Sequence, residues 1–278
     1  MRAQKVAPFT GEGAYHGSTK PRGPSAIPAT PPVDEMRPTT LERGITQIAD
    51  FTATFPNHYA VATTLPVPSQ AEIEADGITF CWSLIDDAIA AAGPLTRRVL
   101  EAMTAHLRRT KRFIYIDSKI QWFEAGDTPV DSQHWHVDGS IASRDHRVHA
   151  LGYELLHDMR ARFAHPSPPV YLAYQSSTHC ATQFATAPVT LALPELIPSF
   201  DLLDERVRAI DPPCVSQPPS SIVAFDGLSL HRAVPATSAG WRLWIRCTET
   251  DHEIRVNPSI IDCYGTVFRG AMPHMNDH

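Results

Sequence analysis

The sequence predicts an α+β fold, in which helices, mainly from the N-terminal half, pack outside a β-sandwich or barrel. Two observations lead to this prediction. Up to Lys111 apolar residues recur at helical spacing, as in Val99, Leu100, Met103 and Leu107. Beyond Lys111 the chain is rich in β-branched and aromatic residues, in short runs separated by Pro and Gly. Helices followed by many short strands are typical of one sheet-based core with helices outside it.

The composition excludes some classes of protein and favours others. Of the 278 residues 43% are hydrophobic, which is enough for a real core, and the net charge of −6 lacks the basic excess of nucleic-acid-binding proteins. The five cysteines form no CxxC pair, which disfavours a zinc ribbon or a disulfide framework. No N-terminal apolar segment and no membrane-length run occurs, so we expect a cytoplasmic protein with no membrane partner.

The chain divides into an arm and one domain. Residues 1–40 are rich in Pro, Gly and Thr, and predict an extended or disordered arm. Residues 41–278 are expected to form a single domain, with a helical front at 41–111, a β core at 112–250 and a C-terminal extension at 251–278.

Capping signals place the helices of the front. The run from Ser69 to Glu72 is a capping-box pattern that opens a short helix. Residues 79–92 indicate a second helix with Gly93 as its C-cap, and Pro94 suits the first turn of the next helix.

Strand candidates fill most of the β core. The first, at 113–123, combines β-branched and aromatic residues along its whole length. The others are 133–139, 169–176, 187–193, 221–226, 229–234 and 241–250. Residues 151–163 fit either a helix or an insertion.

Three candidate metal ligands fall in this β core. In the run HWHVDG at 134–139, His136 and Asp138 are two apart and would share one face of a strand. The run FDGLSLH at 225–231 adds a distal His231. Two imidazoles and one carboxylate on one face of an octahedral ion leave positions open, as in non-haem iron(II) oxygenases. A jelly-roll barrel suits this set, because inward side chains alternate along each strand and converge in its mouth.

The order of these residues resembles a known family. His136-x-Asp138, the distal His231 and an Arg shortly after it resemble the iron(II)- and 2-oxoglutarate-dependent dioxygenases, which are double-stranded β-helix (jelly-roll) enzymes, over roughly residues 113–250. The resemblance implies Fe(2+) as the metal, 2-oxoglutarate and O2 as co-substrates, and succinate and CO2 as co-products. Hydroxylating members carry an acidic ligand such as Asp138, so hydroxylation, demethylation or desaturation is expected.

The far carboxylate of 2-oxoglutarate needs a cation, best an arginine fork. Arg242 and Arg246, eleven and fifteen residues after His231, share a strand face with Trp244. Two Arg in an otherwise apolar strand are costly unless they meet anions. The resemblance assigns Arg242 to 2-oxoglutarate and Arg246 to a second anion contact or substitute. For each, a structural ion pair with a core carboxylate is the alternative.

Two more residues near these motifs receive a prediction. Thr182 lies in the run CATQF at 180–184, which resembles the family's Gly-Asp-Thr-x-Phe segment, whose Thr hydrogen-bonds 2-oxoglutarate. An ordinary strand threonine is its alternative role. His134 shares the expected face of His136 and Asp138, and we interpret it as a neighbour that does not bind the metal, with Trp135 in the core.

Two other functions remain open. The pattern HxHxD also begins the HxHxDH motif of metallo-β-lactamases, which are zinc-dependent hydrolases, but Gly139 replaces the last His. A jelly-roll metal-binding or structural protein without oxygenase activity is the alternative outside the enzymes. Arg242 discriminates: a buried guanidinium without an ion pair favours co-substrate binding, and a salt bridge favours a structural role.

The substrate is defined only by class. No catalytic residue beyond the metal ligands is predicted. A small-molecule or nucleotide/base-like substrate is preferred. The basic run at 108–112 keeps a nucleic-acid substrate open, although the acidic net charge disfavours it.

Overall fold

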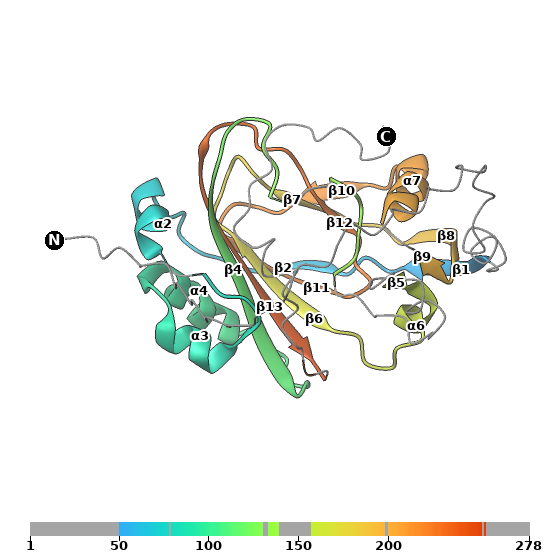
Figure 1. Ribbon diagram of the computed structural model, residues 1–278, viewed down its shortest axis with the longest axis horizontal. Helices are drawn as coiled ribbons and strands as arrows, with labels where there is room; N and C mark the ends of the chain where they lie inside the picture. The colour runs from blue at the N-terminus through green and yellow to red at the C-terminus, as the bar shows by residue number, and fades with distance from the viewer. Residues whose placement is uncertain are drawn as a thin grey trace, which may run out of the picture.

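The computed structural model describes residues 50–77, 79–129, 133–138, 157–197, 200–251 and 253, which form an α+β fold (Figure 1). The arm predicted at 1–40 lies outside these residues, as does most of the predicted extension at 251–278. All strand pairs among the described residues are antiparallel. The strands are β1 (Asp50–Phe55), β2 (Tyr59–Thr64), β3 (Ser83–Leu84), β4 (Phe113–Phe123), β5 (His157–Asp158), β6 (Val170–Gln175), β7 (Thr182–Ala185), β8 (Val189–Pro194), β9 (Leu196–Ile197), β10 (Cys214–Ser216), β11 (Ser221–Asp226), β12 (His231–Ala233) and β13 (Gly240–Thr250). The helices are α2 (Gln70–Asp76), α3 (Ile85–Ala91), α4 (Pro94–Thr104), α6 (Met159–Phe163) and α7 (Asp201–Ile210).

A six-stranded sheet in the order β2-β11-β6-β13-β4-β3 forms the larger layer. Its longest strands, β13 and β4, pair along their whole length, from Gly240 opposite Phe123 to Thr250 opposite Phe113. These strands confirm the predictions at 113–123 and 241–250. A three-stranded sheet, β10-β7-β12, lies across from the larger one, and two-stranded sheets β1-β8 and β5-β9 complete the set (Figure 1).

The helices α2, α3 and α4 gather on the outer side of the large sheet, near β4 and β13 (Figure 1). Leu100 and Met103 of α4 are fully buried in one core cluster with Ile116 of β4 and with Leu243 and Ile245 of β13. This packing confirms the prediction that N-terminal helices cover the β core from outside. Burial of these side chains supplies most of the driving force that fixes the helices to the sheet.

The predicted helix starts at Ser69 and Pro94 are confirmed. The Ser69 hydroxyl accepts a hydrogen bond from the backbone N–H of Glu72 at 3.2 Å, and the Glu72 carboxylate accepts one from the N–H of Ser69 at 2.8 Å. Helix α2 ends at Gly77, whose φ of 71° is left-handed. Pro94 is the first residue of α4.

The helix predicted at 79–92 is wrong in its first half, because α3 begins only at Ile85. Trp82 has a φ of 50°, outside helical values, and its N–H donates to the buried carboxylate of Asp117 at 2.9 Å. Gly93 is the N-cap of α4 and does not cap α3, which ends with Ala92 as its C-cap. A Cβ at Gly93 would lie 2.6 Å from the backbone oxygen of Asp76, so this close approach explains the glycine.

Three other elements differ from the sequence predictions. The region expected as a helical front contains strands β1 and β2. The predicted strand at 133–139 is wrong for its described residues, 133–138, where His136 alone forms a bridge, to His231. The sequence did not predict helix α7, which lies next to this segment. Side chains of α7 form hydrogen bonds with the backbone of 133–138, in the place of a neighbouring strand. The undecided region 151–163 ends in β5 and α6, and residues 151–156 lie outside the described part.

Two further properties bear on earlier expectations. No helix in the described part of the chain has the length and apolar character that crossing a membrane requires. The cysteines within it, at positions 81, 180, 214 and 247, are free thiols.

Asp76 joins α2 to α4, and its removal should destabilise the helical layer. Its buried carboxylate accepts hydrogen bonds from the N–H groups of Leu95 at 2.7 Å and Thr96 at 3.0 Å, the orphan donors of the first turn of α4. We expect Asp76→Ala to lower the free energy of unfolding by about 1–3 kcal/mol, measured by urea denaturation. The exposed Glu74, replaced by Ala in the same helix, should change it by less than about 0.5 kcal/mol. Equal losses in both variants would contradict the capping role.

Candidate metal centre

The structure brings the three predicted metal ligands together. His136 and His231 exchange two backbone hydrogen bonds, at 2.9 and 3.0 Å, and Asp138 follows two residues after His136. One ligand atom from each of His136, Asp138 and His231 lies within 4.8 Å of the other two. Two imidazole nitrogens and one carboxylate oxygen at this separation can coordinate one divalent ion.

Backbone carbonyls fix both imidazoles in the tautomer that a metal needs. The Nδ1 of His136 lies 2.8 Å from the carbonyl oxygen of His134, and the Nδ1 of His231 lies 2.9 Å from that of Ser229. Because a carbonyl only accepts, we assign the proton of each ring to Nδ1. The lone pair of each Nε2 is then available as a ligand.

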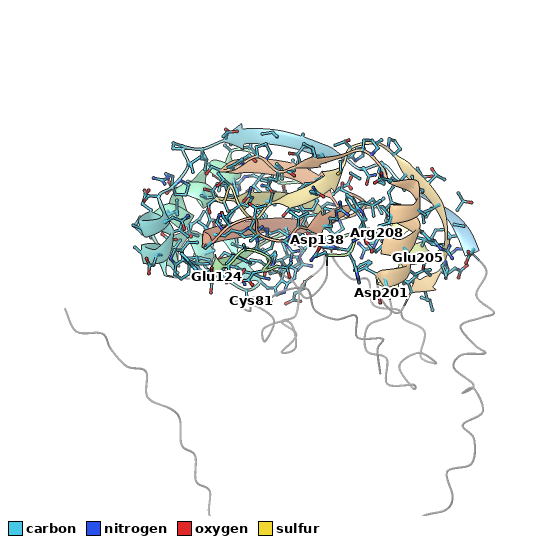
Figure 2. All side chains as sticks on the ribbon, turned by 90° about the horizontal axis from the view of Figure 1, so that it is seen from above. Cys81, Glu124, Asp138, Asp201, Glu205 and Arg208 are labelled. Carbon is cyan, nitrogen blue, oxygen red and sulfur yellow. The ribbon has the colours of Figure 1, made fainter. Side chains whose placement is uncertain are left out.

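Helix α7 positions the segment that carries His136 and Asp138. Asp204 accepts a hydrogen bond from the N–H of Trp135 at 2.8 Å, and Arg208 donates one to the carbonyl of Gln133 at 3.2 Å. The Nδ1 of His134 lies 2.8 Å from the Oδ1 of Asp201, and His134 is absent from the three-ligand group. Figure 2 labels Asp138, which belongs to this segment, and Asp201 and Arg208, which belong to α7. Trp135 is buried in the core, as predicted.

Arg246, on β13, forms an ion pair with the carboxylate of Asp138. Its Nη1 lies 2.8 Å from the Oδ1 of Asp138, and its Nη2 lies 3.0 Å from the Oδ2 of the fully buried Asp117. Its guanidinium carbon lies over the rings of Trp82 and Trp244, at 5.3 and 5.5 Å from their centroids. In this structure Arg246 therefore has the structural ion pairs that the sequence left as its alternative role. Sequence reasoning missed Asp117, although a carboxylate in the apolar run FIYID is an uncommon signal.

The electrostatic environment keeps Asp138 and His136 in the forms that bind a cation. Burial opposes ionisation of Asp138, but the charge of the Arg246 guanidinium outweighs it and holds the pKa of this carboxyl well below its usual range. Burial, together with the nearby His231, lowers the pKa of His136 from 6.5 to about 4. At neutral pH an anionic carboxylate and a neutral imidazole are the forms that coordinate metals.

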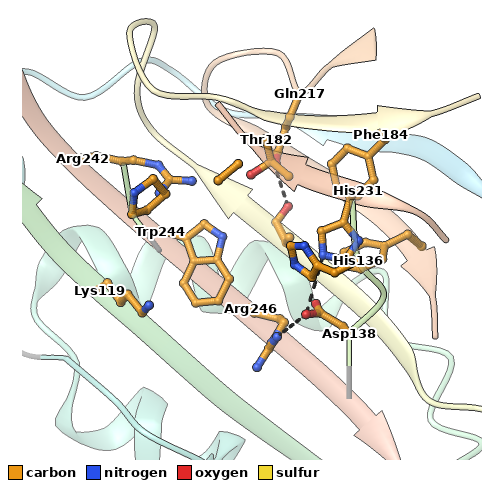
Figure 3. Close-up of a pocket in the computed structure, with 14 residues that line it drawn as sticks. Lys119, His136, Asp138, Thr182, Phe184, Gln217, His231, Arg242, Trp244 and Arg246 are labelled. Atoms are coloured by element: carbon orange, nitrogen blue, oxygen red, sulfur yellow. Dashed lines mark hydrogen bonds and ion pairs between the residues drawn. The ribbon is translucent and has the colours of Figure 1, made fainter. Parts of the chain in front are cut away.

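A cavity of about 180 Å³ opens beside the three ligands and is lined from both sheets (Figure 3). The predicted cofactor-binding residues Thr182, Arg242 and Arg246 all line it. Arg242 is 3% exposed, and within the described residues it has no hydrogen bond or ion pair, its buried Nε included. The sequence did not single out Lys119 and Gln217, which also line the cavity, because neither belongs to a recognisable motif.

The cavity thus holds two arginines of different character. Arg246 is neutralised by Asp117 and Asp138, whereas Arg242 has no anion among the described residues. A buried guanidinium that lacks an anion is costly unless a ligand supplies one.

Removing Arg246 should destabilise the protein strongly, because two carboxylates would remain buried without their cation. We expect Arg246→Met to lower the free energy of unfolding by about 3–5 kcal/mol, measured by urea denaturation at neutral pH. The control is the exposed Arg98, whose Nη2 lies 3.8 Å from the Oε1 of Glu72. Arg98→Met should lower the free energy of unfolding by less than about 1 kcal/mol. A loss below 1 kcal/mol at Arg246 would contradict the ion-pair network.

The lowered pKa of His136 predicts a pH-dependent stability. Between pH 6.5 and about 4 the unfolded chain protonates this imidazole and the folded protein does not. The unfolded state then binds more protons, so stability falls as the pH falls through this window, by about 1–3 kcal/mol in total. Urea denaturation of the metal-free protein at several pH values should show this loss. His136→Asn should flatten the curve, while a variant of the exposed His106 should keep it.

Comparison with known proteins does not identify the chain. No model of a protein family matches it, and a search of curated proteins finds no significant match. Any assignment of function therefore depends on the geometry and chemistry of His136, Asp138, His231 and Arg242.

Proposed function

We propose that this protein is a non-haem Fe(II)/2-oxoglutarate-dependent dioxygenase that hydroxylates a small-molecule or nucleotide/base-like substrate. The observation that carries the proposal is Arg242, a buried arginine that has no anion among the described residues and lies in the same cavity as His136, Asp138 and His231. A metal site alone would not need such a cation, but a dicarboxylate co-substrate does.

The donor set fits ferrous iron. His136 and His231 would bind it through Nε2 and Asp138 through a carboxylate oxygen, a set of two imidazoles and one carboxylate that leaves positions for other ligands. A two-zinc hydrolase would need more ligands. His134 is paired with Asp201, and the described residues contain no second group of His, Cys, Asp or Glu with metal-binding geometry.

The second half of the cavity fits 2-oxoglutarate. Arg242 would hold its far carboxylate, with Thr182 as a hydroxyl donor from the facing sheet. Bound iron, 2-oxoglutarate and O2 would supply the oxidising chemistry, which converts 2-oxoglutarate to succinate and CO2 and places one oxygen atom in the substrate. The protein's own part is to bind the iron, to fix the co-substrate and to exclude water with Phe184, Phe225 and Trp244.

The fold and the location follow from the same proposal. We interpret the two facing antiparallel sheets as a double-stranded β-helix, and support comes from the cavity between them, which β7 and β12 line on one side and β6, β11 and β13 on the other. Free thiols in the described part support a reducing compartment such as the cytoplasm. The aromatic lining of the cavity supports a small, partly apolar substrate.

Anaerobic titration tests the proposal directly. Ferrous iron and 2-oxoglutarate added together to the native protein should produce a visible charge-transfer band, because the keto acid then chelates the metal. Arg242→Met should weaken 2-oxoglutarate binding by about tenfold or more, since it removes the charge-assisted hydrogen bonds to the carboxylate. His136→Ala should abolish the band.

The controls separate the alternatives. Arg232→Met is the control for Arg242→Met. Arg232 donates a hydrogen bond to Gln183 and does not line the cavity, so its replacement should leave the charge-transfer band intact. If native protein binds iron but gives no band with 2-oxoglutarate, the dioxygenase proposal is wrong and a metal-binding protein remains. Hydrolysis that depends on zinc, without oxygen consumption, would favour the hydrolase.

A further inference from the structure

We propose that Arg162 is a positioning residue for the metal centre, an inference that rests on the proposed function. Arg162 lies in α6 and is 4% exposed. Its Nη1 donates hydrogen bonds to the carbonyl of Asp138 at 2.7 Å and to that of Gly227 at 3.2 Å. One guanidinium nitrogen thus connects the two chain segments that carry all three ligands.

This connection adds to the contacts between the two segments, which include the guanidinium of Arg232 over the ring of Trp135, 4.6 Å from its centroid. The segment 133–138 belongs to no strand, and its bridge to β12 consists of the two backbone bonds between His136 and His231. Arg162 adds a hydrogen bond to the main chain at Asp138 itself. The same Nη1 also holds the carbonyl of Gly227, four residues before His231, in the turn where Asp226 accepts a hydrogen bond from the N–H of Leu228.

The cost of burying Arg162 argues for a role at the site. Its Nε and Nη2 are buried and have no hydrogen-bond partner in the described part of the chain, and burial lowers its pKa. An apolar side chain of similar volume would avoid this desolvation, and such replacements are often neutral or stabilising. We infer that Arg162 is buried despite this cost because it fixes the positions of the Asp138 and Gly227 carbonyls.

Helix α6 does not depend on Arg162 for its own position. The side chain of its N-cap, Asp158, accepts a hydrogen bond from the N–H of Ala161 at 2.8 Å. Met159 is fully buried, and the ring of Phe163 packs edge-on against Phe55 at 5.0 Å. Substitution of Arg162 should therefore leave the helix in place.

Hydrogen exchange of the metal-free, full-length protein tests the tie without any ligand. We expect Arg162→Met to accelerate exchange on the order of tenfold in peptides that cover 133–138 and 227–233, the effect of losing hydrogen bonds from a charged donor. Arg162→Lys should restore part of the protection, because an ammonium group also donates to carbonyls. The matched control is Arg160, an exposed residue of the same helix that forms an ion pair with Glu195. Arg160→Met should change the exchange rate of neither peptide.

Titration with Co(2+), an optical probe for the iron site, is the second measurement. Arg162→Met should weaken Co(2+) binding about 10–100-fold and shift the visible spectrum of the bound ion. Unchanged exchange in Arg162→Met would overturn the positioning role, whatever the Co(2+) result. Faster exchange in a protein whose native form binds no divalent ion would leave the tie standing and sink the proposed function. If Arg162→Met does not fold, Arg162→Lys and Arg162→Ala supplied with dilute guanidinium give the same readouts.

Discussion

The reciprocal hydrogen bonds between the backbones of His136 and His231 are the constraint on which the rest of the site depends. They couple a segment that belongs to no sheet to β12, and β12 pairs with β7, which carries Thr182. A shift of one residue at this bridge would turn the side chain of one histidine to the opposite side. The positions of His136 and His231 are therefore set by main-chain pairing, and α7 holds the segment of His136 through the N–H of Trp135.

The large sheet performs two tasks through one strand. On the helix side of β13, Leu243 and Ile245 are buried in the main core, while on the other side Arg242 and Arg246 line the cavity. The period of two that builds the core therefore also delivers two cations to one place. Their fates differ because β4 supplies a carboxylate, Asp117, to Arg246, whereas no described residue supplies one to Arg242.

The sequence was sufficient for features that depend on local pattern. The long strands β4 and β13, the capping box at Ser69 and the grouping of His136, Asp138 and His231 all follow from spacing and residue type. Features that depend on distant partners were not accessible. The alternation of residues at 133–138 predicts a strand, but the structure has none there. Asp204 and Arg208 of α7 bind the backbone of this segment instead. Asp117 and Arg162 act only through residues far away in the chain, and neither shows a motif.

The carbonyls that orient the two imidazoles have a consequence for how this site tolerates sequence change. The groups that fix the rings of His136 and His231 belong to the main chain of His134 and Ser229, which every residue type possesses. In many metal sites a side-chain carboxylate has this task, and one mutation removes it. Here drift at positions 134 and 229 leaves the ring orientation intact as long as the backbone keeps its path. Substitutions should then be felt most at His136, Asp138 and His231 and at the few side chains that hold that path.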